Sequence, residues 1–311
     1  MSRRTVLIPT IQGNGAAGMK TVNLPGGYDY FATSRVGATC TAANMTQFQT
    51  LVNSSPWRNL TGTQQDQINQ IDLLAAMSVD NTLRVPYEIP RLKSIDQQYG
   101  TTLNTLAPDQ DTNASINTLQ ETWTDTTTDT WSMWAEVDDH APNAGTGGVE
   151  RLAVWNLNLV ANTTFSSSIA PFIQGATGQP ITRFLHAAYF LAASGTLGNG
   201  ETRVTRGMQG QIMFDRLAQL NARILTDYGI RSIPTAYTTA NGGFIIDTCE
   251  TGVAEMIDTM YEAPANTPSN AAGLVQRDGK RLLPYPNVDI RLSPTATGAG
   301  AVILRSLGYV A

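Results

Sequence analysis

The same order of expected elements occurs twice along this chain, before and after a glycine-rich segment at residues 142–148. Alternating or apolar runs at residues 20–24, 83–89 and 130–137 predict strands in the first copy. Matching runs lie at residues 184–193, 243–249 and 301–307 in the second copy. The offset between matching runs is roughly 160 to 170 residues, as a duplicated structural unit requires. We therefore expect the chain to contain one β unit twice.

A helix is expected between early strands of each copy. In the first copy Met45, Phe48, Leu51 and Val52 have helical spacing, and Thr41 or Asn44 is a candidate N-cap. A second short helix is expected around residues 68–75. In the second copy the expected helix begins at Asp215 and ends at Gly229.

About eight strands in each half, with a helix inserted between early strands, are typical of a jelly roll, in which two antiparallel sheets pack face to face. We predict an all-β chain with short inserted helices, folded as two tandem jelly-roll β-sandwiches. The predicted domains are residues 1–144 and 145–311, with the glycine-rich segment at the seam. Each half has the length of an ordinary domain.

Charge is scarce in this chain. Charged residues make up 14% of the sequence, and the formal net charge is -5. An average soluble domain has roughly 25% charged residues. This composition argues against a nucleic-acid partner bound by a broad basic face. Uncharged polar surfaces instead suit packing against neighbouring molecules, because amides and hydroxyls cost less to desolvate than ions.

One motif suggests a cofactor and is better explained as a turn. Residues 13–18 match the pattern GxGxxG, which in dinucleotide-binding proteins is followed by a helix that receives the pyrophosphate. Here residues 19–24 alternate like a strand, and Pro25-Gly26-Gly27 ends it. We predict a flexible hairpin turn and no cofactor.

Catalytic residues are not assigned, because no nucleophile, base and orienting group occur together in a known arrangement. His140 and His186 lie far apart, and Cys40 and Cys249 lie one in each half, which predicts small buried thiols without zinc. The aspartate pairs at residues 109/111, 125/129 and 138/139 are interpreted as solvated loop charges. Structural calcium is the alternative, but the sequence places no such site.

Two features of the sequence, the first arginines and the tryptophans, each allow two interpretations. Arg3 and Arg4 precede the first strand, and they either approach anionic lipid headgroups as a membrane-proximal end or belong to a disordered terminus. Trp123, Trp131, Trp134 and Trp155 surround the seam. They either fill the two cores, which we favour, or anchor an interface between subunits.

The pattern as a whole resembles a known family. The quoted segments are residues 20–25 leading into 28–31, residues 211–217, residues 243–247 and residues 301–310. The chain resembles the double jelly-roll major capsid proteins of tailless, icosahedral, membrane-containing bacteriophages, and the corticovirus type in particular. The resemblance covers nearly the whole chain and rests on architecture, since none of these segments is a sharp motif.

The resemblance implies a structural protein without catalytic residues, found in the virion and assembled in the host cytoplasm. Three copies would form a pseudo-hexagonal tile of six jelly rolls standing on an internal lipid membrane. The implied partners are further copies in the capsid lattice, vertex or minor capsid proteins, and the membrane surface. The alternative is a vertex, spike or surface β-sandwich protein that binds a receptor or glycan, since lectins share the jelly roll.

Overall fold

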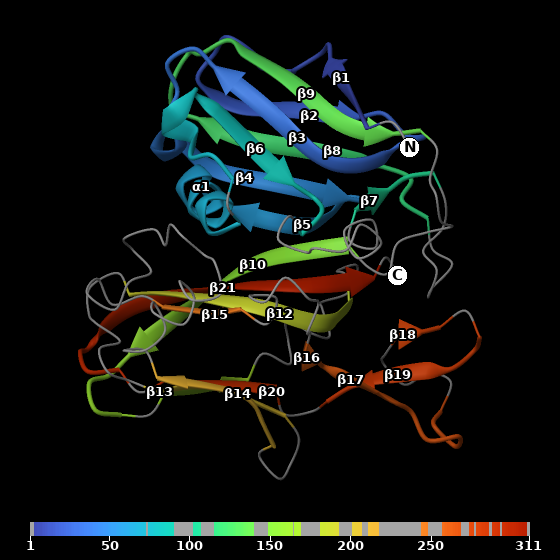
Figure 1. The fold of residues 1–311 in the computed structure, drawn as a ribbon, viewed down its shortest axis with the longest axis vertical. Coiled ribbons are helices and arrows are strands. Elements are labelled where there is room, and N and C mark those ends of the chain that lie inside the picture. Colours follow the sequence, from blue (N-terminus) through green and yellow to red (C-terminus); the bar gives the residue numbers. More distant parts are fainter. Residues whose placement is uncertain are drawn as a thin grey trace. The chain divides into compact units, whose positions relative to one another are not determined.

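The chain forms two compact units in a computed structural model, Met1–Ala153 and Val154–Tyr309 (Figure 1). The structure describes residues 3–72, 74–89, 102–106, 115–139, 149–163, 165–168, 181–192, 201–206, 211–217, 244–247, 257–268, 274–276, 278–285, 288–292 and 294–309. The predicted boundary at residues 144/145 and the glycine-rich segment lie outside these ranges. No helix within these ranges is long and apolar enough to cross a bilayer.

The first unit contains two antiparallel sheets. One sheet has the order β1-β9-β3-β6, and β7 also pairs with β3. Its strands are β1 (Arg4–Ile8), β3 (Asp29–Gly37), β6 (Thr82–Pro86), β7 (Leu103–Asn104) and β9 (Trp131–Asp138). Pro86 ends β6, which is an edge strand of the sheet, where its missing backbone N–H costs no ladder hydrogen bond.

The second sheet of this unit has the order β2-β8-β4-β5. Its strands are β2 (Gly18–Leu24), β8 (Leu119–Asp125), β4 (Met45–Val52) and β5 (Ser55–Leu60). Strand β10 (Val149–Leu159) adds one parallel bridge from Leu152 to Arg58 of β5. The two sheets share one apolar core, to which β9 contributes Trp131, Met133 and Ala135, and β8 contributes Trp123.

One helix lies beside β6 of the first sheet and β4 of the second. Helix α1 (Gly62–Ile71) begins at a capping box in which the Thr61 hydroxyl accepts from the Gln64 backbone N–H, and the Gln64 side chain accepts from the Thr61 N–H. Asn69 of α1 donates to the Arg84 carbonyl of β6 at 2.7 Å. Short 3-10 turns, η1 (Ala42–Asn44) and η2 (Met77–Val79), complete the helical content described. The helix expected near residues 68–75 is therefore present, but it begins and ends earlier.

The helix expected at residues 45–52 is wrong, because these residues form β4. A bulge between Met45 and Gln47 inserts one extra residue, so Met45 and Phe48 both face the core although they lie three apart. That spacing imitates a helix. Thr41, one of the two N-cap candidates, occupies the N-cap position of the single turn η1, but its side chain makes no capping hydrogen bond.

The second unit is described in parts. β12 pairs with β15, β16 and β21, and a separate sheet has the order β11-β20-β13-β14. A three-stranded sheet has the order β17-β19-β18. The strands are β11 (Phe165–Ser168), β12 (Ile181–Ala192), β13 (Glu201–Arg206), β14 (Gln211–Leu217), β15 (Phe244–Asp247), β16 (Ile257–Asp258), β17 (Met260–Glu262), β18 (Leu274–Val275), β19 (Arg281–Pro284), β20 (Val288–Leu292) and β21 (Gly298–Tyr309).

The sheet around β12 is buried on both faces. Consecutive residues 302–307 of β21 and 245–247 of β15 are all buried, although successive side chains of a strand point to opposite faces. One buried residue is Arg305, whose Nη1 donates to the Tyr189 hydroxyl at 2.6 Å. Continuous apolar runs such as 302–304 are the sequence signal of such a strand.

The predicted repeat is right in part for its strands and is wrong for its helices. The strands matched in the sequence, at Val22 and Leu185, Val85 and Ile245, and Trp131 and Val302, are strands in both units. β6 and β9 pair with β3 as β15 and β21 pair with β12, so β12 corresponds to β3, and the match of Val22 with Leu185 is wrong because β2 lies in the other sheet. The helix expected from Asp215 does not begin there, because Asp215 and Leu217 lie in β14. The rest of that expected helix, residues 218–229, lies outside the described residues.

Candidate functional site

A buried ion pair lies between the two sheets of the first unit. Arg35 of β3 donates to Glu121 of β8, and both side chains are fully buried. Thr33 donates to Glu121 Oε1 at 2.9 Å, and the Tyr87 hydroxyl donates to the same oxygen. The Arg35 guanidinium also lies 4.9 Å from the Trp123 ring centroid. A carboxylate with this many donors is held in place, so the cluster fixes how the two sheets face each other.

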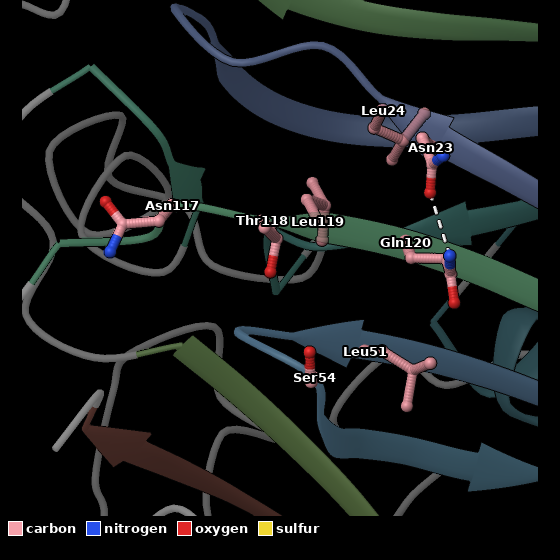
Figure 2. A pocket seen from close by; sticks show the side chains of 8 residues that line it. All are labelled: Asn23, Leu24, Leu51, Ser54, Asn117, Thr118, Leu119 and Gln120. Carbon is pink, nitrogen blue, oxygen red and sulfur yellow. Dashed lines mark hydrogen bonds between the residues drawn. The ribbon is translucent and has the colours of Figure 1, made fainter.

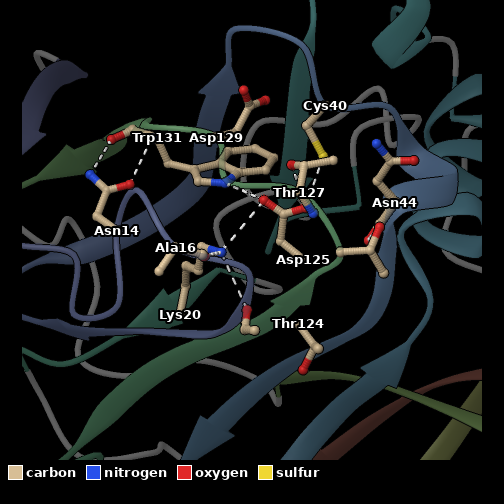
Figure 3. Close-up of polar contacts among 12 residues, drawn as sticks. Asn14, Ala16, Lys20, Cys40, Asn44, Thr124, Asp125, Thr127, Asp129 and Trp131 are labelled. Carbon is tan, nitrogen blue, oxygen red and sulfur yellow. Dashed lines mark hydrogen bonds and ion pairs between the residues drawn. The ribbon is translucent and has the colours of Figure 1, made fainter.

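A second buried ionic cluster surrounds Asp125 (Figure 3). Lys20 Nζ lies 3.5 Å from Asp125 Oδ2, and both side chains are fully buried. Trp131 Nε1 donates to Oδ2 at 2.9 Å, while the Thr127 N–H donates to Oδ1 at 2.8 Å. Burial alone would raise the pKa of Asp125, but the bonds from Thr127 and Trp131 and the Lys20 charge hold it below its usual value.

Residues 13–18, which match the pattern GxGxxG, form a turn, as predicted. Gly13 has a φ of +74°, and a Cβ there would lie 2.5 Å from the Met19 carbonyl oxygen. Asn14 fastens the turn to β9, because its side chain accepts from the Trp131 N–H at 2.7 Å and donates to the Trp131 carbonyl at 3.0 Å (Figure 3). The segment connects β1 to β2, so no helix follows it.

The interpretation of the aspartates as solvated loop charges is wrong for three of them. Asp125, Asp129 and Asp138 are 1%, 8% and 0% exposed. Asp129 accepts from the N–H and hydroxyl of Thr39 at 2.9 and 2.8 Å. Asp125 likewise accepts from the N–H and hydroxyl of Thr127, two residues further along the chain. Asp109 and Asp111 lie outside the described residues.

The interpretation of Cys40 as a buried thiol is confirmed. Cys40 is 0% exposed and donates to Asp125 Oδ1 at 3.7 Å. Burial, followed by the nearby Asp125 charge, raises the pKa of the Cys40 thiol to about 12, so it stays protonated near neutrality. Cys249 and His140 lie outside the described residues, as does the side chain of His186.

Arg3 and Arg4 are ordered residues with partners, so the disordered-terminus alternative is wrong for them. Arg3 forms an ion pair with the buried carboxylate of Glu88, and its guanidinium lies 3.9 Å from the Phe31 ring centroid. Arg4 begins β1, and its Nη2 lies 2.7 Å from Oδ2 of Asp139. Contact with a membrane remains a prediction, and lipid headgroups would have to compete with these carboxylates.

Two tryptophans fill the core of the first unit, as favoured above. Trp123 and Trp131 are 1% and 2% exposed, and their rings meet edge to face with centroids 5.7 Å apart. Trp134 alternates to the outer face of the β1-β9-β3-β6 sheet and is half-buried there. The side chain of Trp155 lies outside the described residues.

The other sheet of this unit presents an uncharged outer face, which we call the amide face. Ladder pairing places its side chains in three rows across β2, β8, β4 and β5. The middle row is Thr21, Thr122, Gln49 and Asn59. The rows on either side are Asn23, Gln120 and Leu51, and Met19, Thr124 and Gln47.

Side-chain amides bond to one another across this face. Gln120 Nε2 donates to Asn23 Oδ1 at 2.8 Å, and Gln49 Nε2 donates to Asn59 Oδ1 at 3.2 Å. The opposite outer face, on the β1-β9-β3-β6 sheet, differs in carrying an ion pair of 2.8 Å between Arg84 and Glu136. The sequence predicted uncharged surfaces in general but did not identify this one.

A recess lies at one end of the amide face (Figure 2). It has a volume of about 430 Å³ and is open to solvent. Its lining combines amides and hydroxyls with aliphatic side chains, namely Asn23, Leu24, Leu51, Ser54, Asn117, Thr118, Leu119 and Gln120. Such a lining can hold an uncharged polar group or an inserted apolar side chain. Across the described part of the chain, no group of three or more His, Cys, Asp or Glu residues is placed to hold a metal ion.

Comparison with known proteins finds likeness in structure and not in sequence. No protein-family model and no curated protein sequence matches the chain. The major capsid protein P2 of bacteriophage PM2 matches with a TM-score of 0.70 at 13% identity, over 100% of this chain and 98% of that chain. The major capsid protein of Sulfolobus turreted icosahedral virus matches with a TM-score of 0.57 at 9% identity, over 100% and 97%. The capsid structure of the virus PBCV-1 matches with a TM-score of 0.50 at 10% identity, over 99% and 96%.

These matches extend over the whole of both chains, so the likeness concerns the complete architecture and not one shared sandwich. The neighbours are double jelly-roll proteins. The chain therefore has the double jelly-roll fold that these viral major capsid proteins share.

Proposed function

We propose that this chain is the structural major capsid protein of an icosahedral virus. The observation that carries the proposal is the full-length match to the PM2 capsid protein P2, in which neither chain has a substantial unmatched part. A fold alone can host several functions. A tandem pair of jelly rolls matched end to end is nevertheless far more specific than a single sandwich, which many lectins and enzymes also contain.

In this proposal three copies form one capsomer, and six jelly rolls give it a pseudo-hexagonal outline. A closed cyclic trimer repeats in a shell through additional contacts between capsomers. The low charge content and the amide face support such repeated contacts, because uncharged surfaces can be buried without desolvating ions. The proposed role needs no catalytic residue.

The proposal extends to the surroundings of the shell. We place the capsomers over an internal lipid membrane, with vertex or minor capsid proteins as further partners, and assembly in the host cytoplasm. Arg3 and Arg4 are the proposed membrane-proximal residues. Arg4 has a side chain that is 48% exposed, so it can reach a headgroup phosphate while Asp139 stays nearby.

The recess favours one other function, in which the chain is a vertex or spike protein that binds a glycan or receptor. Its mixed polar and aliphatic lining suits a sugar. Copy number separates the two functions. A major capsid protein dominates the protein content of purified particles, whereas a vertex protein is a minor band on a stained gel.

Light scattering on the purified chain tests the proposal in solution. We expect a particle of three times the 33.4 kDa mass of one chain. A strictly monomeric chain at high concentration, together with a low copy number in purified particles, would contradict the capsid role.

A further inference from the structure

The amide face is an open face of a sheet, and its openness is the starting observation. Gln47, Asn59 and Asn23 are exposed on it, and Met19 is 66% exposed. The sheet around β12 in the second unit buries both of its faces within the chain, as residues 302–307 show. The amide face is therefore open to solvent, whereas the described residues of the sheet around β12 are covered.

We propose that two copies of this chain meet through their amide faces about a two-fold axis. The inference rests on the proposed capsid role, in which capsomers must contact one another, and it names the surface that makes one such contact. Face-to-face contact about a two-fold axis is isologous, so the same patch serves both copies.

The absence of charge on the amide face favours a second copy of this chain over a nucleic acid, an anionic bilayer or a strongly charged protein. A nucleic acid or an anionic bilayer requires lysine or arginine, and the amide face has neither among its rows. A strongly charged protein partner would leave its own ions desolvated against neutral side chains. A second uncharged polar surface avoids both costs, and the amide face of another copy is such a surface.

Hydrogen-bonding chemistry makes this face complementary to itself. Each Asn or Gln side chain offers two N–H donors and an oxygen that accepts twice. The bond between Gln120 and Asn23, like that between Gln49 and Asn59, uses one donor of the glutamine and one acceptor site of the asparagine. Donors and acceptors therefore occur on the same face, so one copy can pair with another without any like-charge conflict.

The positions of Met19 and the recess fix the orientation of the axis. Met19 and the recess residue Asn23 lie at opposite ends of β2, roughly 14 Å apart at the usual rise per strand residue. A two-fold axis that lies in the interface and runs across the strands exchanges these two ends. The exposed Met19 of one copy then meets the recess of the other, where the partly exposed Leu51 supplies apolar contact.

In the same orientation the middle row lies along the axis, so Gln49 faces Gln49 of the other copy. This gives a specific test. Gln49→Glu places two carboxylates opposite each other, and Gln49→Lys places two ammonium groups there. Each single variant should weaken association between capsomers at least about tenfold, because like charges are forced together. An equal mixture of the two variants should restore association, because opposite charges then meet.

Analytical ultracentrifugation of the full chain measures this association, and thermal unfolding confirms that each variant is folded. Ser132→Glu is the matched control, since Ser132 is an exposed strand residue on the other sheet and should associate like the natural chain. Association of both Gln49 variants at the natural strength, or failure of the mixture to recover, would overturn the two-fold contact.

The proposed function and this inference fail differently. If the natural chain forms no trimer and no larger assembly, the capsid role fails. If the natural chain assembles and the Gln49 variants assemble equally well, the capsid role stands and only the amide-face contact is wrong. A glycan or another protein as the true occupant would give that second result.

Discussion

Asp29 of β3 and Asp138 of β9 lie directly opposite each other in the ladder, and both are almost fully buried. Burial, opposed by a hydrogen bond from Thr102 and strengthened by the Asp138 charge, raises the pKa of Asp29 to about 6. Arg3 partly offsets the negative charge, while Glu88 adds to it. At Asp29 the effect of burial and of the Asp138 and Glu88 charges therefore outweighs the hydrogen bond from Thr102 and the positive charge of Arg3.

The raised pKa of Asp29 should make the stability of the protein depend on pH. The folded-state pKa of Asp29 lies above its unfolded value near 3.8, so its contribution to stability is present below pH 4 and is lost as pH rises through 6. The loss is at most about 3 kcal/mol for a shift of this size. Asp29→Asn should remove this decline and unfold at higher denaturant concentration than the natural chain at pH 8.

The variant Asp138→Asn provides the companion measurement. Removing the Asp138 charge should lower the pH at which the decline from Asp29 occurs, without abolishing it. Urea unfolding between pH 4 and 8 measures both variants. A natural chain and an Asp29→Asn variant with parallel stability curves would show that Asp29 has an ordinary pKa.

The ion pair between Arg35 and Glu121 should be costly to break. Glu121→Gln leaves the Arg35 guanidinium buried without its counter-charge, which should reduce the free energy of unfolding by about 3 to 5 kcal/mol. Replacing both residues with methionine should recover much of that loss, because no charge then remains in the core. Equal losses in the single and double variants would mean that the charge of Arg35 is not the cause.

A side chain at position 13 should destabilise the turn that contains Gly13. Gly13→Ala adds a Cβ at positive φ and 2.5 Å from a backbone oxygen, so we expect a loss of about 2 kcal/mol or more. Gly26→Ala is the control, because its Cβ would meet nothing within 4 Å. Chemical unfolding of both variants checks the difference, and equal stabilities would show that the turn can shift at little cost.

The capping box of α1 should contribute less to the free energy of unfolding than the turn at Gly13 does. Thr61→Ala removes the hydroxyl that accepts from the Gln64 N–H and should cost about 1 kcal/mol. Thr63→Ala makes the same chemical change at an exposed position within the helix and should be neutral or slightly stabilising. A Thr61→Ala variant as stable as Thr63→Ala would mean that water replaces the cap.

The sequence was sufficient to predict strands wherever alternation is regular. In β9, Trp131, Met133 and Ala135 face the core as their period of two predicts. The same reasoning failed in β4, where the bulge after Met45 breaks the period and the spacing then fits a helix. A bulge is decided by the neighbouring strands, so a local pattern cannot reveal it.

The sites were harder to predict than the strands, because their members are distant in sequence. Asp125 stands in a threonine-rich stretch that reads as a loop, and its buried environment depends on Lys20 and Trp131. The amide face depends on the register that places Thr21 beside Thr122 and Gln49. Only the alternation of Gln47 with Gln49, and of Gln120 with Thr122 and Thr124, was visible as a signal along the chain.

An electron microscopy map of the assembled particle tests the capsid role most directly. The account predicts shells tiled by capsomers with a six-lobed outline, each built from three copies of this chain. A particle in which this chain appears only at the vertices, or in which the shell is built from another protein, would contradict it.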